Sequence, residues 1–230
     1  DSLVFELSDA EPLVSLSKKP TILVIGDVQK GVYELVFRKA NFGFISYNEA
    51  MLVDGGEYID QYTLDELNRF DVLFLYGYKY KSRVKAWRLL DDYVREGGRL
   101  YMDTGWQFVS ADWEVGETAD FFPTTMLSWT NFGKTSDYSL HPGLINTEEV
   151  DTRGFDPLIW EDSPWGVSSG DALRPWAEPI LTVSGHPLVA GGQYGKGKVV
   201  WSGMNLLGHI RFFDSKNQEL IFASRLIDWL

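Results

Sequence analysis

The sequence predicts an α/β fold with a mostly parallel sheet and helices on both faces. Short apolar runs alternate with segments of helical spacing, which is typical of strands joined by right-handed helical crossovers. The apolar runs are continuous, and this indicates strands that are covered on both faces. The chain has 230 residues, of which 44% are hydrophobic, so it is long enough to bury such a core.

The first half of the chain supplies the parallel strands. Residues 1–20 precede them and are expected to form a lead-in segment or an added edge strand. Strands are then expected at 21–27 (TILVIGD), 43–50 (GFISYNEA), 71–78 (DVLFLYGY) and 99–105 (RLYMDTG). A helix is expected between the first two, since apolar residues recur at helical spacing at Val32, Leu35, Val36 and Ala40.

Two further helices have recognisable boundaries. Residues 63–70 begin with Thr63 as the N-cap, and Glu66 three positions later completes a capping box. A longer helix is expected over residues 82–96, because Ser82 can cap it and a pair of glycines ends it. Its inward side is expected to carry Val84, Trp87, Leu90 and Val94.

The alternation of strands and helices stops in residues 107–178. This segment is rich in Pro and Gly and is expected to be a long, mostly irregular insertion. It holds 13 acidic and three basic residues, and therefore most of the net charge of -12. Because Trp is common at binding hot spots, the insertion is expected to form an interaction surface over the carboxyl end of the sheet. The alternative is that its tryptophans fill a small core of the insertion itself. Its tryptophans are Trp113, Trp129, Trp160, Trp165 and Trp176.

The C-terminal part predicts a β-hairpin and a helix. Strands are expected at 179–183, 187–195 and 197–203, with the last two joined by a tight Gly-Lys-Gly turn. Residues 215–230 have the apolar spacing of an amphipathic helix that packs on the core.

Composition excludes several classes of function. The absence of Cys excludes disulfides, thiolate metal sites and thiol catalysis. Nucleic acid is not expected as a partner, because phosphate binding needs clustered Lys and Arg in place of a net charge of -12. No apolar run is long enough for a transmembrane segment. No cofactor is expected, since no phosphate-binding glycine loop follows Gly26.

Three segments carry a family resemblance: GGRLYMDTGWQ, YGKGKVVWSGMNL and NQELIFASRLIDWL. With the order of the elements, they resemble the class I glutamine amidotransferase-like superfamily, and in particular its non-catalytic extracytoplasmic branches. The resemblance implies a flavodoxin-like fold for a domain at 21–230 that contains the insertion. It also implies a binding or assembly module of a larger extracytoplasmic protein, with that protein's other domains as partners. The lack of Cys fits the cytoplasm equally well.

The nucleophile elbow of that superfamily is altered here. Its Cys aligns with Asp103, its Gly with Gly105 and its Gln with Gln107. A carboxylate is a poor replacement for a thiolate in the attack on an amide. In addition, no His of the chain is followed two positions later by the Glu of the superfamily. Glutamine hydrolysis is therefore not expected.

Two roles are open for Asp103. It could serve a carbohydrate-active or related hydrolase as nucleophile or base, with His209 nearby, because ligand sites of α/β folds lie at the carboxyl ends of strands. Alternatively, its carboxylate accepts hydrogen bonds from backbone amides of the turn that follows the strand. The second role is favoured, because fold alone does not imply an activity.

A ligand site and a metal site can also be formulated. Aromatic, acidic and amide side chains at the strand ends suit a sugar or a protein ligand, or else they pack beneath the insertion. These candidates are Asp27, Tyr76, Tyr78, Asp103, Trp106 and Asn205. A weaker alternative is a Ca²⁺ site, although acidic loops are usually only solvated and no regular calcium loop is present. Its ligands would be Glu148, Glu149, Asp151 and Asp156.

Overall fold

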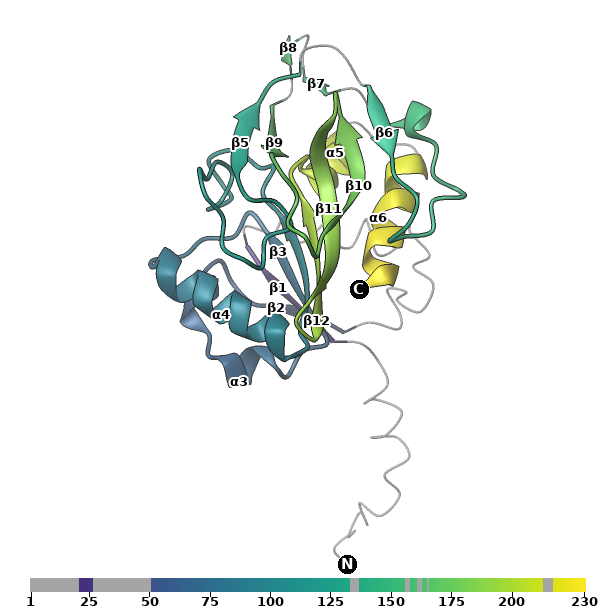
Figure 1. The fold of residues 1–230 in the computed structure, drawn as a ribbon. Coiled ribbons are helices and arrows are strands. Elements are labelled where there is room, and N and C mark those ends of the chain that lie inside the picture. Colours follow the sequence, from purple (N-terminus) through teal and green to yellow (C-terminus); the bar gives the residue numbers. More distant parts are fainter. Residues whose placement is uncertain are drawn as a thin grey trace, which may run out of the picture.

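A mixed β-sheet forms the centre of the protein (Figure 1). The structure is a computed structural model that describes residues 21–26, 51–132, 137–155, 158–160, 163–164, 166–212 and 217–230. Among these residues, eight strands pair in the order β2-β1-β3-β4-β12-β11-β10-β6. Their bounds are β1 Thr21–Ile25, β2 Met51–Asp54, β3 Val72–Tyr76, β4 Arg99–Asp103, β6 Tyr138–Leu140, β10 Glu178–Val183, β11 His186–Tyr194 and β12 Gly197–Ser202.

The sheet has a parallel and an antiparallel half. Strands β2, β1, β3, β4 and β12 are parallel, while β11, β10 and β6 continue the sheet in antiparallel pairs. The mostly parallel, flavodoxin-like sheet with a C-terminal hairpin and helix is thus confirmed. The expected strand at 43–50 lies outside the described residues, and so do residues 1–20 and the helix expected after β1.

Helices cover both faces of the sheet, as the sequence predicts (Figure 1). Side chains alternate along β1, so that Ile22 and Val24 point to one face and Leu23 and Ile25 to the other. The first face packs against α5 (Leu206–Phe212) and α6 (Asn217–Trp229). The second packs against α3 (Leu64–Leu67) and α4 (Arg83–Glu96).

The predicted helix boundaries agree with the structure. The Thr63 side chain accepts the backbone N–H of Glu66, whose carboxylate accepts the N–H of Thr63 at 2.8 Å, so the capping box is formed. At the start of α4, the Ser82 side chain accepts the backbone N–H of Lys85. The inward position of Val84 was predicted wrongly, because its side chain is 79% exposed. It lies beside the apolar stripe of α4, which is formed by Ala86, Leu89, Leu90, Tyr93 and Val94.

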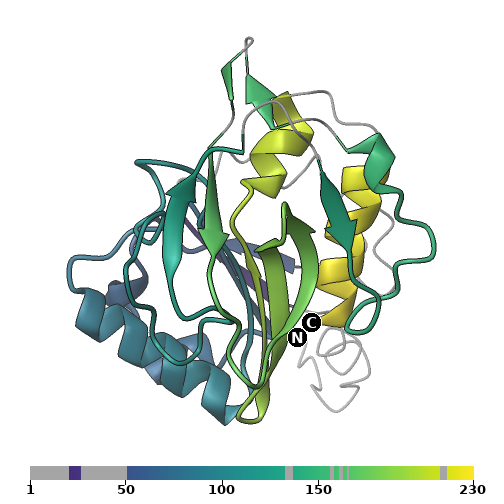
Figure 2. The ribbon, with the colours of Figure 1, turned by 45° about the horizontal axis from the view of Figure 1, so that its top comes forward.

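The segment 107–178 is more regular than its composition predicts. Strands β5 (Leu127–Thr130) and β9 (Val167–Gly170) form an antiparallel ribbon alongside β11 (Figure 2). The segment also contains a short β7–β8 pair (Ile159–Trp160 and Ser163–Pro164) and the 3₁₀ turn η2 (Thr152–Gly154). A second 3₁₀ turn, η1 (Ile59–Gln61), lies outside the segment and precedes α3.

The insertion contributes to both hydrophobic layers. Phe121, Phe122 and Leu127 are buried on the α4 face of the sheet, while Ile145, Phe155 and Leu158 are buried on the α6 face. Strand β6 also closes one edge of the main sheet. The segment is therefore built into the core from both sides. None of the helices in the described ranges has the length and apolar character to cross a membrane.

Candidate functional site

Asp103 is the last residue of β4, in the middle of the parallel half of the sheet. It stands between Tyr76 at the end of β3 and Ser202 at the end of β12. Parallel strands bring their carboxyl ends to one edge, so these residues meet although they are far apart in sequence. The Asp103 side chain is completely buried at this edge.

Both carboxylate oxygens of Asp103 accept backbone hydrogen bonds. Oδ1 accepts the N–H groups of Gly105 at 2.9 Å and Asn205 at 3.2 Å. Oδ2 accepts the N–H of Leu206, the first residue of α5, at 2.9 Å. An anionic acceptor at a helix N-terminus satisfies amides that have no partner within the helix. The carboxylate therefore joins the end of β4 to the start of α5.

Burial raises the pKa of Asp103 from its ordinary value of 3.8 to about 6. The loss of hydration is the largest cause, because it disfavours the charged form. The hydrogen bonds from Gly105, Leu206, Ser202 and Asn205 oppose this rise by stabilising the carboxylate.

The turn after Asp103 packs directly on the backbone that follows β12. A Cβ atom added at Gly105 would lie 2.2 Å from the nitrogen of Asn205 and 2.5 Å from the oxygen of Gly203. Such distances leave no room for a side chain. The elbow position is thus enclosed by protein backbone.

The other candidate residues at this edge are only partly brought together. Tyr76 is buried and donates its hydroxyl to Oδ1 of Asn205 at 2.6 Å. The ring of Trp106 lies 5.1 Å from the ring of Tyr76 and is half-buried. Asp103 and Asn205 complete this group through the hydrogen bond above. Asp27 lies outside the described residues.

Tyr78 belongs to a different buried group, centred on Asp112. The hydroxyls of Tyr78 and Tyr80 and the indole N–H of Trp87 all donate to the Asp112 carboxylate. Burial raises the pKa of Asp112, while these donors oppose the rise. Asp112 is not among the residues predicted from the sequence, because nothing in its neighbours along the chain indicates burial.

His209 forms a buried pair with Glu219, a residue that the sequence analysis also missed. Nδ1 of His209 lies 2.6 Å from Oε1 of Glu219, and both side chains are fully inaccessible. The pair joins α5 to α6. The sequence did contain a signal for Glu219, because it is a charged residue at an inward position of the otherwise apolar helix α6.

The acidic residues of the calcium alternative are partly engaged with arginine. Asp151 binds Arg153 through several hydrogen bonds, the shortest at 2.7 Å, and Glu149 pairs with Arg225. Asp156 lies outside the described residues. In the part of the chain that the structure describes, no group of three or more His, Cys, Asp or Glu is arranged to hold a metal ion.

A row of aromatic rings lies on the insertion close to the elbow. The ring centroids of Phe108 and Trp113 are 5.3 Å apart, and those of Trp113 and Trp129 are 5.5 Å apart. Phe108 is 79% exposed, whereas both tryptophans are half-buried. We call these three residues the aromatic ridge. The two tryptophans were predicted from the sequence to belong to an interaction surface, and Phe108 was not.

Phe108 also has an unfavourable backbone conformation. Its φ angle of +63° lies in the left-handed region, which a bulky residue other than glycine rarely adopts. Such residues persist only where the surrounding structure holds them, and they are frequent at functional sites. Exposure and backbone conformation therefore both single out Phe108.

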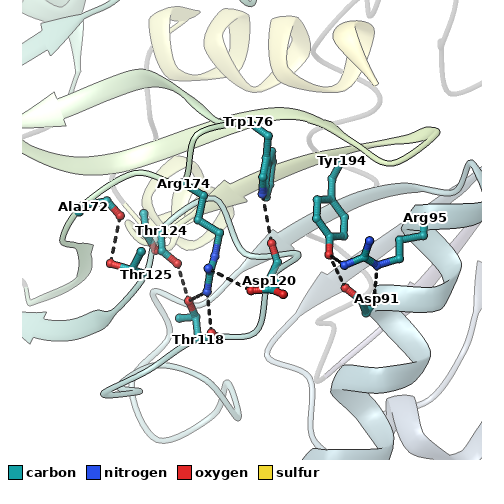
Figure 3. Close-up of polar contacts among 10 residues, drawn as sticks. All are labelled: Asp91, Arg95, Thr118, Asp120, Thr124, Thr125, Ala172, Arg174, Trp176 and Tyr194. Atoms are coloured by element: carbon teal, nitrogen blue, oxygen red, sulfur yellow. Dashed lines mark hydrogen bonds and ion pairs between the residues drawn. The ribbon is translucent and has the colours of Figure 1, made fainter.

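Trp176, by contrast, joins two parts of the insertion and also contacts β11 (Figure 3). Its indole N–H donates to the carbonyl of Asp120 at 3.1 Å, and its ring lies 5.1 Å from that of Tyr194. Arg174 donates to the carbonyl of Thr118 at 2.7 Å and pairs with Asp120 at 3.1 Å. These contacts fix the base of the ridge-bearing loop. The side chains of Trp160 and Trp165 lie outside the described set.

Comparison with solved structures supports the fold. The chain is similar to cytoplasmic protein STM1381 from Salmonella typhimurium LT2, with a TM-score of 0.60, 17% identity, and coverage of 90% of this chain and 98% of that one. It is similar to cytoplasmic protein STM3548 from Salmonella typhimurium, with a TM-score of 0.52, 17% identity, and coverage of 90% and 98%. A ThuA-like protein from Bacteroides uniformis ATCC 8492 has a TM-score of 0.50 and 12% identity, with coverage of 91% and 90%.

No family model matches the sequence. No curated protein matches it either. The structural likeness, at these low identities, concerns the fold alone. The chain therefore shares with these proteins an α/β fold, a mostly parallel sheet with helices on both faces.

Proposed function

We propose that this chain is a non-catalytic binding module with its binding surface on the aromatic ridge. The observation that carries the proposal is the state of Asp103 at the elbow position. Its carboxylate is fully buried, and both of its oxygens accept backbone N–H groups. A nucleophile or base has to reach its substrate, and this carboxylate is enclosed by the backbone of Gly105 and Asn205.

The ridge supports the binding part of the proposal. An exposed Phe108 next to two partly buried tryptophans is the kind of aromatic cluster that dominates binding energy at interfaces. The loop that carries it is fixed at its base by Arg174 and Trp176, so the ridge is held in place before a partner arrives. The ligand is a protein or a carbohydrate.

The proposal includes a larger extracytoplasmic protein in which this chain is one domain, on the basis of the resemblance of its closing segments. Expression of the full gene product with a tag, followed by cell fractionation, tests this part. Recovery of the full product only in the cytosolic fraction would contradict it.

Two measurements test the central claim. Incubation with glutamine and with a panel of aryl glycosides is expected to release ammonia and aryl alcohol at the buffer rate, for the wild type and for Asp103→Asn alike. If the wild type releases either product above the buffer rate and Asp103→Asn does not, the result would support a hydrolase that uses Asp103 and would contradict the proposal. Binding is then measured by tryptophan fluorescence against arrays of peptides and soluble oligosaccharides. Failure of both arrays to give binding that depends on Phe108 would refute the binding role of the ridge.

A further inference from the structure

We infer that the partner of the aromatic ridge is a protein segment that presents an arginine or lysine side chain. This inference rests on the proposed function, and it names the class of ligand for that surface. The shape of the ridge, its charge and the exposure of Phe108 each support it.

The shape of the ridge fits a protein segment better than a sugar chain. The ring planes of Phe108 and Trp113 are inclined at 61°, and those of Trp113 and Trp129 at 79°. Rings so inclined do not form a flat surface on which successive sugar rings could stack. Gly166 lies against Trp129, since a Cβ atom placed there would be 2.5 Å from that ring. The ridge thus presents ring edges at different inclinations, which suit the varied side chains of a protein segment.

The segment that carries the ridge is acidic in sequence. Residues 107–132 contain four acidic residues, Asp112, Glu114, Glu117 and Asp120, and no Lys or Arg. Asp112 is buried, and Asp120 pairs with Arg174. Glu114 and Glu117 are exposed, and neither forms an ion pair within the described ranges. A cationic partner would complement this charge, while an acidic partner would be repelled.

Phe108 provides the remaining contact. A guanidinium or ammonium group binds over the face of an aromatic ring, and 79% of Phe108 is accessible. Glu114 is exposed and directly follows Trp113, whose ring lies 5.3 Å from that of Phe108, so the same segment carries an exposed aromatic ring and an exposed carboxylate. This combination selects a basic side chain over a neutral polar one.

The test uses the purified chain on arrays of randomised nonapeptides in which the central residue is Arg, Lys, Leu or Glu. The Arg and Lys arrays are expected to bind about tenfold more strongly than the Leu and Glu arrays, and raised salt is expected to weaken this binding. Phe108→Ala and the double variant Glu114→Gln/Glu117→Gln should each remove the preference. Val84→Ala is the matched control, because Val84 on α4 is equally exposed at 79%. Circular dichroism verifies that each variant is folded.

Each other outcome overturns the inference. Equal binding to the Leu array would remove the role of charge, and binding unchanged in Phe108→Ala would remove the role of the ridge. Binding to oligosaccharides that is lost in Phe108→Ala would make the ligand a glycan, so the inference would fail while the proposed function stands. Absence of binding to peptides and oligosaccharides alike would overturn both.

Discussion

The Asp103 carboxylate and the backbone N–H of Leu206 are 2.9 Å apart, although 103 positions separate them in the sequence. The contact places a buried acidic group at the first turn of α5. It connects the strand that carries the elbow to the helix that follows β12, and it makes the protonation of Asp103 one contribution to the pH dependence of folding stability.

Stability should therefore change with pH through Asp103. Burial raises the folded-state pKa from 3.8 to about 6, so the folded protein binds a proton more tightly than the unfolded chain does. The stabilisation is fully present below the unfolded pKa and is lost as the pH rises through about 6. It amounts to about 3 kcal/mol. Urea unfolding at pH 4.5 and 7.5 should show about 2 kcal/mol of this contribution in the wild type and none in Asp103→Asn, because pH 4.5 lies above the unfolded pKa. Identical pH dependence in both proteins would contradict it.

Gly105→Ala should destabilise the protein by about 2 kcal/mol or more, because the new Cβ would collide with the backbone of Asn205. Gly116→Ala is the matched control, since a Cβ atom there meets nothing within 4 Å and should change stability by less than about 0.5 kcal/mol. Both are measured by denaturant unfolding. Similar stabilities of the two variants would show that the turn can move away from α5.

The backbone strain at Phe108 predicts an unusual order of stabilities. Phe108→Gly and Phe108→Ala both remove the ring, but only glycine is unstrained at a φ of +63°. The Gly variant should therefore be more stable than the Ala variant by about 1 kcal/mol, the reverse of the order in a helix. Thermal unfolding of the pair measures this difference. An Ala variant as stable as the Gly variant would mean that the left-handed conformation is not kept.

Loss of one partner of the buried pair in α5 and α6 should be costly. Glu219→Ala removes the carboxylate that lies 2.6 Å from His209, inside a fully inaccessible region. We expect a loss of about 3 kcal/mol. Glu148→Ala, at an exposed position, should be neutral within about 0.5 kcal/mol. Denaturant unfolding compares the two, and a loss below 1 kcal/mol for Glu219→Ala would assign little stability to the pair.

The anchor at the base of the ridge can be tested by proteolysis. Arg174→Met removes the 2.7 Å hydrogen bond to Thr118 and the ion pair with Asp120. Cleavage by chymotrypsin within residues 107–132 should become several-fold faster, because the loop opens more often. Lys196→Met, in the β11–β12 turn, is the control and should leave the rate unchanged. An unchanged rate in Arg174→Met would show that Trp176 suffices as the anchor.

Local signals predicted much of the fold. Strands β1, β3 and β4 were visible as apolar runs, the start of α3 as a capping box, and the β11–β12 hairpin as a Gly-Lys-Gly turn, whereas β2 was not predicted. Each of these patterns is contained in a few neighbouring residues, so the sequence alone reveals it.

The missed elements depend on distant partners. Helix α5 was not predicted, because it is short, contains Gly208, and receives the amide acceptor at its start from Asp103. Strand β6 pairs with β10 across about forty residues. The same holds at the site, where Asp112 and Glu219 are defined by hydrogen bonds with residues on other elements. The sequence predicted the position of Asp103 at the elbow. It did not predict that the backbone N–H groups of Asn205 and Leu206, after β12, donate to the Asp103 carboxylate.

The strand order of the sheet has a consequence for biosynthesis. Strand β12 lies between β4 and β11, so its residues pair with Arg99–Asp103 on one side and with β11 on the other. During translation, β4 emerges about a hundred residues before its neighbour and has an open edge until then. Contacts over such separations slow folding, and open strand edges promote aggregation. Chains that end before Ser202 should therefore depend on chaperones, because the edge of β4 stays unpaired. In longer chains, β12 can pair with β4 and β11 and cover this edge.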